Sequence, residues 1–302
     1  MKKTLITIIG PTAIGKTSVA IKVAEHFHTE IISADSRQFY KELKVGTAKP
    51  TEEELNKVRH HFINSLSIQD PYNVGQFETD TIQFLQTIFK KHDVVVMAGG
   101  SGLFVNAVCH GLDELPESDP DLRCELKKLS DENGIEALQE KLSGLDPEYY
   151  ESVDRSNPHR LIRAIEVCMM TGMKYSDLRK KEKKEREFIC IKIGLDDDRE
   201  KVYTRINERV DEMMQNGLLD EAKKFYSLRH LNALQTVGYR ELFDFLEEKI
   251  SFEEAVGLIK RNTRRYAKRQ LTWFRKDEGI NWFLPVEQES MLKYITNVIN
   301  QS

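Results

Sequence analysis

The residues with the clearest chemistry lie between Gly10 and Thr17 and match the G-x-x-x-x-G-K-[ST] pattern of a phosphate-binding loop. Apolar residues 4–9 predict a buried strand before the loop, and residues 16–27 have helical periodicity after it. Backbone N–H groups at such a helix start bind anions, Lys16 adds a positive charge, and the Thr17 hydroxyl can bind Mg²⁺. A chance match on an ordinary strand–turn–helix is the alternative. The pattern predicts a di- or triphosphate site formed by Gly10, Pro11, Thr12, Ala13, Ile14, Gly15, Lys16 and Thr17.

A carboxylate follows the next expected strand, residues 30–34, which ends at Asp35. In an open parallel sheet the carboxyl ends of the strands frame the ligand crevice, so Asp35 is expected to face the phosphate site. An ordinary ATPase would also have an acid after the apolar strand 94–98, but glycines follow that strand and Asp93 precedes it. Asp35 can bind a metal, bind a sugar or act as a general base. The alternative is that it caps the turn through Ser36.

The net charge is −4, but the basic residues are gathered locally. Residues 260–276 contain eight basic residues and no acid, while a second basic run at 179–186 is diluted by glutamates. An acidic protein with such clusters can present a face that binds phosphates. The alternative for the first cluster is a solvated face of an amphipathic helix, with Tyr266, Leu271 and Trp273 packed inward.

The scaffold that positions these groups is expected to be an α/β core. Expected strands at 4–9, 30–34 and 94–98 alternate with helical segments, and a further strand is expected at 188–194. This alternation predicts a parallel sheet with helices on both faces.

A helical domain is expected to interrupt this core. Residues 119–186 show helical patterns and no convincing strand, and the chain is helical again from 196 to about 277. Three prolines stand near expected helix starts in the interruption: Pro120, Pro147 and Pro158. We therefore expect residues 1–115 and 187–302 to form the core and residues 116–186 to form an inserted all-helical domain.

Composition excludes several other classes of protein. The 302 residues are 40% hydrophobic, which suffices for a proper core, and no apolar run approaches the roughly 20 residues of a membrane span. The opening resembles a signal peptide, but its apolar stretch stops at Gly10 and favours a strand. The four cysteines form no Cys-x-x-Cys pair, which fits a reducing compartment. We expect a cytoplasmic protein that acts as a monomer without a membrane partner.

Several blocks beyond the phosphate loop resemble the family of tRNA dimethylallyltransferases. Residues 35–40 and 45–50 look like the signature that follows the phosphate loop in that family. Five more blocks match in the family's order: 60–63, 99–103, 157–164, 237–241 and 268–275. Together with the loop, the blocks extend over most of the chain, and such an ordered set is far more specific than a phosphate loop alone.

The resemblance implies a P-loop, nucleoside-kinase-like core with a helical insertion. It also implies transfer of a dimethylallyl group from dimethylallyl diphosphate to the N6 amine of adenosine 37, beside the tRNA anticodon. By the family's pattern the loop holds the diphosphate and Asp35 accepts the amine proton. Lys16, Thr17 with Mg²⁺, and Arg209 would balance the charge of the leaving group, which is physically reasonable because an allylic diphosphate departs easily once its charge is stabilised.

Only the family resemblance assigns Arg209 a role at the diphosphate. Arg205 and Arg209 lie four residues apart, so both could point the same way from one helix. The alternative is a solvated, salt-bridged face with Glu208 and Asp211.

The partner implied by the resemblance is the tRNA anticodon stem-loop, whose target adenosine must be unstacked to reach a carboxylate. The C-terminal helices of the core would contact the tRNA. The expected RNA-binding residues are Asp35, Ser36, Arg37, Gln38, Ser101, Arg123, His159, Arg160, Arg163, Gly238, Arg240, Lys268, Arg269 and Arg275.

The chain departs from the family pattern at a few positions. Ser101 and Phe104 stand where the family usually has threonine and tyrosine, and Ile14 replaces a commoner serine. Ser101 keeps a hydroxyl, and Ile14 is expected to change packing more than chemistry. The cysteine and histidine spacing does not match the zinc-finger extension of eukaryotic relatives, which points to the bacterial form.

Two other functions compete with the transferase. An ATP-using small-molecule kinase could be built on the same core, although the missing acid after strand 94–98 and the basic C-terminal region oppose it. A non-catalytic RNA-binding protein with a vestigial loop would make Lys16 and Asp35 dispensable, yet both are intact.

Overall fold

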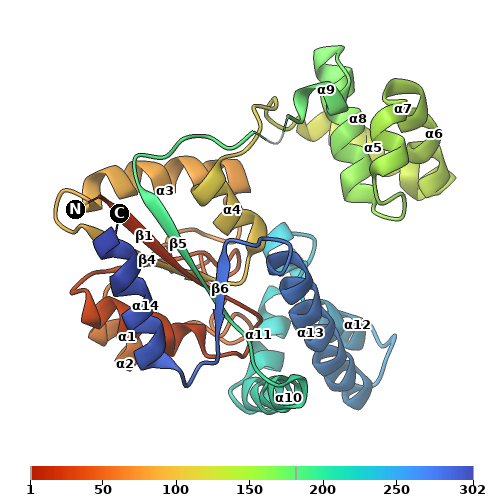
Figure 1. Cartoon of the computed structure of the whole chain (residues 1–302). Helices are drawn as coiled ribbons and strands as arrows, with labels where there is room; N and C mark the ends of the chain where they lie inside the picture. Colours follow the sequence, from red (N-terminus) through yellow and green to blue (C-terminus); the bar gives the residue numbers. More distant parts are fainter. Residues whose placement is uncertain (1, 181, 302) are drawn as a thin grey trace. The chain divides into compact units, whose positions relative to one another are not determined.

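The computed structural model describes residues 2–180 and 182–301 and divides into two compact units (Figure 1). Unit 1 comprises Met1–Cys109 and Arg186–Ser302, and unit 2 comprises His110–Glu185. The sequence placed these boundaries at 115/116 and 186/187. Three residues lie outside the described part of the chain: Met1 of the apolar opening, Lys181 of the second basic run, and Ser302.

Unit 1 is built on a parallel six-stranded sheet with the strand order β3-β2-β4-β1-β5-β6. Its strands are β1 (Thr4–Ile9), β2 (Ile31–Ser33), β3 (His60–His61), β4 (Val94–Gly99), β5 (Ile189–Leu195) and β6 (Ile280–Phe283). The four strands expected from the sequence are present, each within one residue of its expected ends, and the α/β class is confirmed. The two edge strands, β3 and β6, were not predicted, because runs of two and four residues are too short to show a period.

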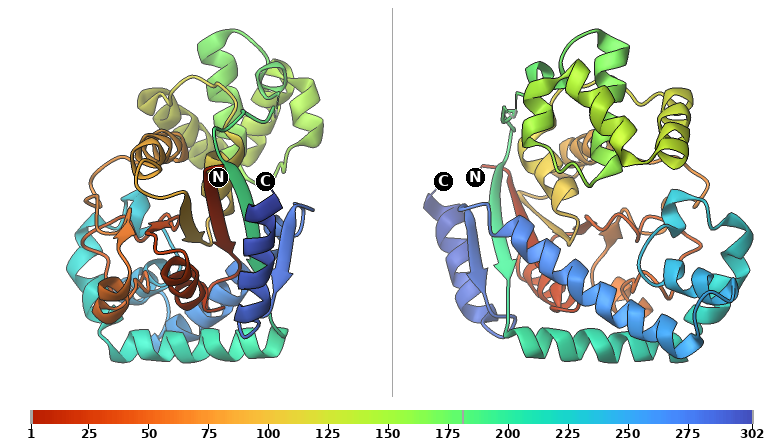
Figure 2. Two further views of the ribbon diagram at one scale, coloured as in Figure 1. Left: turned by 60° about the vertical axis from the view of Figure 1, so that its left-hand side comes forward. Right: turned by 90° about the vertical axis from the view of Figure 1, so that its right-hand side faces the viewer.

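Helices cover both faces of this sheet because the side chains of a buried parallel strand alternate between two cores (Figure 2). One face carries α1 (Lys16–His26) and α14 (Gln288–Gln301), and the other carries α3 (Val74–Ile88) and α4 (Gly102–His110). In β1, Ile6 and Ile8 pack into the first core, whereas Leu5 and Ile9 pack into the second. The short helix α2 (Glu52–Lys57) precedes β3.

A helical layer follows β5 within unit 1 and packs around a third core. It contains α10 (Arg199–Gln215), α11 (Leu218–Phe225), α12 (Tyr239–Leu246), α13 (Phe252–Phe274) and two 3₁₀ turns, Tyr226–Leu228 and Asn232–Leu234. Tyr239, Leu218 and Leu242 are fully buried there. The helices expected after residue 196 are therefore present, and α10 packs beside α13.

Unit 2 is all-helical over residues 110–180 and 182–185. Its helices are α5 (Pro120–Asn133), α6 (Ile135–Leu145), α7 (Pro147–Ser152), α8 (Pro158–Thr171) and α9 (Tyr175–Leu178). The three prolines singled out from the sequence each open a helix, where the missing N–H costs nothing. Leu138, Leu142 and Leu161 form the centre of its own core.

No helix in the described part of the chain combines the length and the apolar character needed to cross a bilayer.

Candidate active site

The phosphate loop connects β1 to α1, and three of its residues have positive φ: Gly10 (150°), Ala13 (61°) and Gly15 (96°). A Cβ on Gly10 would lie 2.6 Å from the carbonyl oxygen of Leu195, so glycine is needed where the loop leaves β1 beside β5. Gly15 precedes α1 without a side-chain cap, which leaves the first N–H groups of the helix suited to an anion. Ile14 is 1% exposed and packs into the core, as expected of a change in packing.

Lys16 folds back onto the loop, where its Nζ donates to the Pro11 carbonyl oxygen at 2.7 Å. Burial lowers the pKa of Lys16 to about 8, while the Asp35 carboxylate raises it and the Arg209 guanidinium lowers it. The three groups therefore interact electrostatically. An anion bound in the loop would favour the charged form of Lys16.

Asp35 follows β2 at the same edge of the sheet as the phosphate loop and lines two cavities. The smaller cavity, about 40 Å³, is also lined by Lys16 and Thr17. The larger cavity, about 270 Å³, is also lined by Thr12 and Arg209. Asp35 thus borders both the cavity at the phosphate loop and the larger cavity at Arg209.

The turn after Asp35 is held by side-chain hydrogen bonds. Asp35 Oδ1 accepts from the Arg37 N–H at 3.0 Å, so the carboxylate caps its own turn in addition to lining both cavities. Ser101, which follows β4, accepts from the Ser36 N–H at 3.2 Å and its hydroxyl lies 3.3 Å from that of Ser36. Gln38 lines the smaller cavity. The structure therefore brings together five of the residues expected to act on the base.

Arg209 on α10 is directed at the phosphate loop. Its Nη1 donates to Thr12 Oγ1 and its Nη2 donates to the Ala48 carbonyl oxygen, both at 3.4 Å. Arg205, one helical turn earlier, instead pairs with Asp197 at 2.8 Å. Burial lowers the pKa of Arg209, and the nearby Asp35 carboxylate opposes this. Arg205 is therefore ion-paired, although its partner is Asp197 and not the Glu208 or Asp211 of the alternative.

Gln270 on α13 is a site residue that the sequence analysis missed. Its side chain is buried, Oε1 accepts from the Thr12 N–H at 2.9 Å, and Nε2 donates to the Gly100 carbonyl oxygen at 2.8 Å. Both halves of the carboxamide are used, so Gln270 ties α13 to the phosphate loop and to the turn that carries Ser101. Gln270 lies inside the family-like block 268–275, but the resemblance assigned it no role.

The basic residues at α13 divide into paired and exposed ones. Lys260 pairs with Asp211 at 2.6 Å, and Arg264 donates to the Asn207 side chain at 2.7 Å. The exposed residues are Arg261, Arg265, Lys268, Arg269, Arg275 and Lys276. We call these six residues the α13 basic stripe. Within it, Arg275 also pairs with Asp196.

The inward packing of Tyr266, Leu271 and Trp273 that formed part of the alternative is not complete, because Tyr266 and Trp273 are each 38% exposed. One side of the Trp273 ring lies against the backbone of Gly102 at the start of α4, where an added Cβ would approach it within 2.2 Å. Tyr266 lines the larger cavity and hydrogen bonds with Ser101. Burial and the Asp35 carboxylate raise the pKa of Tyr266 to about 12.

The remaining RNA-binding positions expected in unit 1 differ in location: Gly238 and Arg37 line the larger cavity, whereas Arg240 does not. Gly238 lines the larger cavity with φ of 102°, and its N–H donates to Glu241 Oε2 at 2.8 Å. Arg240 is exposed on α12. Arg37 lines the larger cavity and donates to the Asn232 carbonyl oxygen at 2.8 Å.

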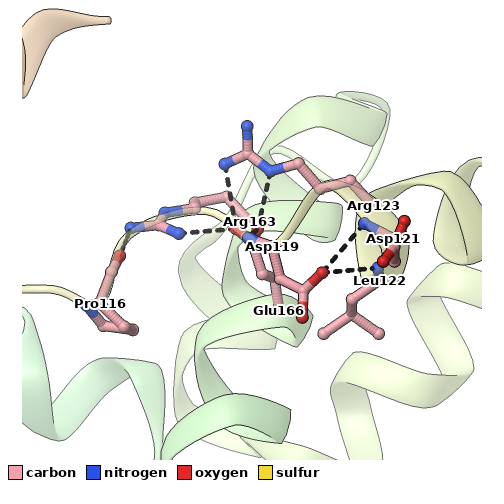
Figure 3. Close-up of polar contacts among 7 residues, drawn as sticks. All are labelled: Pro116, Asp119, Asp121, Leu122, Arg123, Arg163 and Glu166. Atoms are coloured by element: carbon pink, nitrogen blue, oxygen red, sulfur yellow. Dashed lines mark hydrogen bonds and ion pairs between the residues drawn. The ribbon is translucent and has the colours of Figure 1, made fainter.

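The expected RNA-binding residues of unit 2 lie on α5 and α8, and two of them bind one buried acid (Figure 3). The Glu166 carboxylate, fully buried, accepts from Arg123 at 2.8 and 3.0 Å and from Arg163 at 2.6 Å. His159 and Arg160 are exposed at the start of α8. Although burial raises the pKa of Glu166, the hydrogen bonds from the two arginines hold it below its usual range.

Replacing Glu166 with alanine is expected to destabilise unit 2 by about 2–3 kcal/mol, because it leaves two arginines without their carboxylate. This is below the roughly 3–5 kcal/mol of a fully buried pair, since the Arg123 side chain is 45% exposed. Hydrogen exchange of residues 116–170 in the full chain would measure the loss. Glu132→Ala, at an exposed position of α5, is the control. Equal protection in both variants would contradict the prediction.

Fold and site together define a P-loop α/β protein that holds a phosphate-bearing ligand beside a carboxylate. β4 ends at Gly99 and is followed by Gly100 and Ser101, where an ATPase would have its acid. The chain belongs to the IPP transferase family, whose sequence profile matches residues 38–277.

Similar proteins cover the whole chain. A tRNA dimethylallyltransferase of Christiangramia forsetii is 55% identical over 99% of this chain and 100% of its own length, and one of Flavobacterium johnsoniae is 47% identical over 99% of each. A solved tRNA isopentenylpyrophosphate transferase of Bacillus halodurans is 36% identical and superposes with a TM-score of 0.73, covering 99% of this chain and 98% of its own. A eukaryotic dimethylallyltransferase acting on tRNA is 24% identical with a TM-score of 0.75, over 95% of this chain and 75% of its own, and supports the fold.

Proposed function

We propose that this chain is a tRNA dimethylallyltransferase, which transfers a dimethylallyl group from dimethylallyl diphosphate to the N6 amine of adenosine 37 beside the anticodon and releases diphosphate. Family membership and the names of full-length relatives support the activity. The observation that carries the proposal is the position of Asp35. Its carboxylate lines both the cavity at Lys16 and Thr17 and the larger cavity at Arg209.

The transfer step follows from this arrangement. The adenine nitrogen forms a bond to the allylic carbon while the bond from that carbon to the diphosphate oxygen breaks. Asp35 accepts the proton that the amine loses, and the electron pair of the broken bond leaves with the diphosphate. Lys16, Arg209 and the N–H groups at the start of α1 stabilise that developing negative charge.

Mg²⁺ is expected to bind at this site together with the diphosphate. The described residues contain no cluster of three or more His, Cys, Asp or Glu side chains that would form a metal cage. Mg²⁺ is commonly held by few protein groups together with phosphate oxygens and water, and the Thr17 hydroxyl, which lines the cavity at Lys16, would be one protein ligand. When bound, the ion would neutralise part of the diphosphate charge.

The RNA side of the reaction is assigned to exposed basic residues. Lys268, Arg269 and Arg275 of the α13 basic stripe would bind phosphates, and the turn at Asp35–Gln38 with Ser101 would receive the unstacked adenine. In unit 2, His159 and Arg160 are exposed, and Arg123 and Arg163 are held by Glu166. Action as a monomer in the cytoplasm stays a prediction, which sedimentation velocity and cell fractionation would test.

The decisive experiment offers the protein unmodified tRNA and Mg²⁺ with either dimethylallyl diphosphate or ATP. The tRNA is then digested and its nucleosides are analysed by mass spectrometry. Prenylated adenosine formed only with the prenyl donor is the expected result. A phosphorylated product formed from ATP would identify a kinase, and tRNA binding without any product would identify a non-catalytic RNA-binding protein.

Alanine at Lys268 or Arg269 is expected to raise the KM for tRNA and leave kcat nearly unchanged, because both residues are exposed and act through phosphate charge. Each substitution should also reduce the slope of log K against log salt concentration by about 1. Filter binding at several salt concentrations measures this. Lys293→Ala, at an exposed position of α14, is the control. Salt slopes that match the wild type would remove these residues from the RNA interface.

A further inference from the structure

The loop between residues 43 and 49 is held by a single carboxylate. Glu221 Oε2 accepts from the N–H groups of Lys44 at 2.8 Å and Val45 at 3.0 Å, and Oε1 accepts from the N–H of Gly46 at 3.0 Å. The Tyr239 hydroxyl also donates to Oε1, at 2.6 Å. Four donors therefore converge on Glu221, and hydrogen bonds to an ionised carboxylate are about twice as strong as neutral ones.

The Tyr239 ring also packs against the backbone of this loop. It is fully buried, and a Cβ added to Gly46 would lie 2.6 Å from its ring, so the loop backbone packs directly on the tyrosine. Gly46 and Thr47 in turn line the larger cavity. The four donors and this packing help to fix a segment that is neither helix nor strand, together with the turn bond from the Ala48 N–H to the Val45 carbonyl oxygen at 3.2 Å.

One backbone carbonyl group of this loop accepts hydrogen bonds from two residues of the site. Ala48 has φ of 43°, in the left-handed region, and its carbonyl oxygen accepts from Gln38 Nε2 at 3.2 Å and from Arg209 Nη2 at 3.4 Å. Arg209 has a long side chain with many rotamers, and within the described part of the chain its hydrogen-bond partners are this carbonyl and Thr12 Oγ1. Movement of the loop would therefore displace the guanidinium.

We infer that Glu221 is a positioning residue for the transfer reaction: it holds residues 44–46 so that the Ala48 carbonyl aims Arg209 at the diphosphate and Gln38 at the base. This inference rests on the proposed function of Arg209 and Gln38. A carboxylate is required because glutamine has one acceptor oxygen. Its NH₂ group would face at least one N–H that now donates to Glu221.

Glu221→Gln is expected to lower kcat by about 100-fold, because a displacement near 1 Å in a catalytic group costs that much. The KM for tRNA should change little. Asp220→Asn is the matched control, since this neighbouring acid of α11 is 84% exposed and pairs only loosely with Lys223 at 3.8 Å. Tyr239→Phe removes one of the four donors and should have a smaller effect than Glu221→Gln.

A double-mutant cycle with Arg209→Ala separates positioning from simple loss of folding. If Glu221 acts through Arg209, Glu221→Gln will cost far less in the Arg209→Ala background than in the wild type. The same factor in both backgrounds, after correction for the folded fraction, would overturn the inference, as would wild-type kcat for Glu221→Gln. Wild-type protein that fails to prenylate tRNA would instead refute the proposed function, so the two failures are distinguishable.

Discussion

Replacing Asp35 with asparagine is expected to lower kcat for prenyl transfer by about 10²- to 10⁴-fold, the usual contribution of a general base. Asparagine keeps the size of the side chain and an oxygen that can accept the Arg37 N–H, so the turn after β2 should persist. It cannot accept the proton of the adenine amine. Single-turnover rates with saturating tRNA and donor would measure the effect, and filter binding should show unchanged affinity for tRNA.

Asp93→Asn is the matched control for this prediction. Asp93 is an acid beside a strand of the same sheet, but it precedes β4 and pairs with Lys3 at 2.7 Å, away from the carboxyl ends of the strands. It should leave turnover unchanged. Loss of both tRNA binding and turnover in Asp35→Asn would assign Asp35 a structural role. Full activity of Asp35→Asn would show that Asp35 is not the general base.

The residues that were predictable from sequence are those whose position follows from local pattern or strand order. The phosphate loop is continuous in the chain, so its eight residues and their strand and helix could be found together. The placement of Asp35 needed only the rule that strand ends share one edge of a parallel sheet. Arg209 was found by resemblance, because helical spacing alone could not separate it from Arg205.

The residues that were missed act through contacts between distant segments. Gln270 meets the phosphate loop 258 positions away, and Glu221 meets Gly46 across 175 positions. A glutamine and a glutamate on amphipathic helices are ordinary surface residues until the tertiary fold is known. The partial exposure of Trp273 has the same origin, because its neighbour is Gly102, the first residue of the distant helix α4. Tertiary contacts of this kind leave no local pattern.

Removing the charge of Lys16 is the second change with a large expected effect. Lys16→Met should lower kcat/KM for the prenyl donor by about 10²- to 10³-fold, the loss seen when one donor to a developing negative charge is removed. Lys22→Met is the control, because Lys22 is exposed further along the same helix and bonds to Gln288. Comparable losses in both variants would show that general charge on α1, rather than Lys16, supports the reaction.

The pH dependence of diphosphate binding tests Lys16 more specifically. Burial lowers the pKa of Lys16 to about 8 in the ligand-free protein, and a bound anion favours the ammonium form. Binding above pH 8 therefore requires uptake of a proton by Lys16, so its titration should not affect the affinity below pH 8 and should weaken it as the pH rises beyond 8. Lys16→Arg stays charged over this range and should lose that dependence. Calorimetric titration with inorganic diphosphate over about three pH units around that pKa, from roughly 6.5 to 9.5, compares the two proteins. Ionisation of the ligand itself is common to both and cancels in the difference. Parallel curves for wild type and Lys16→Arg would mean that the titrating group is not Lys16.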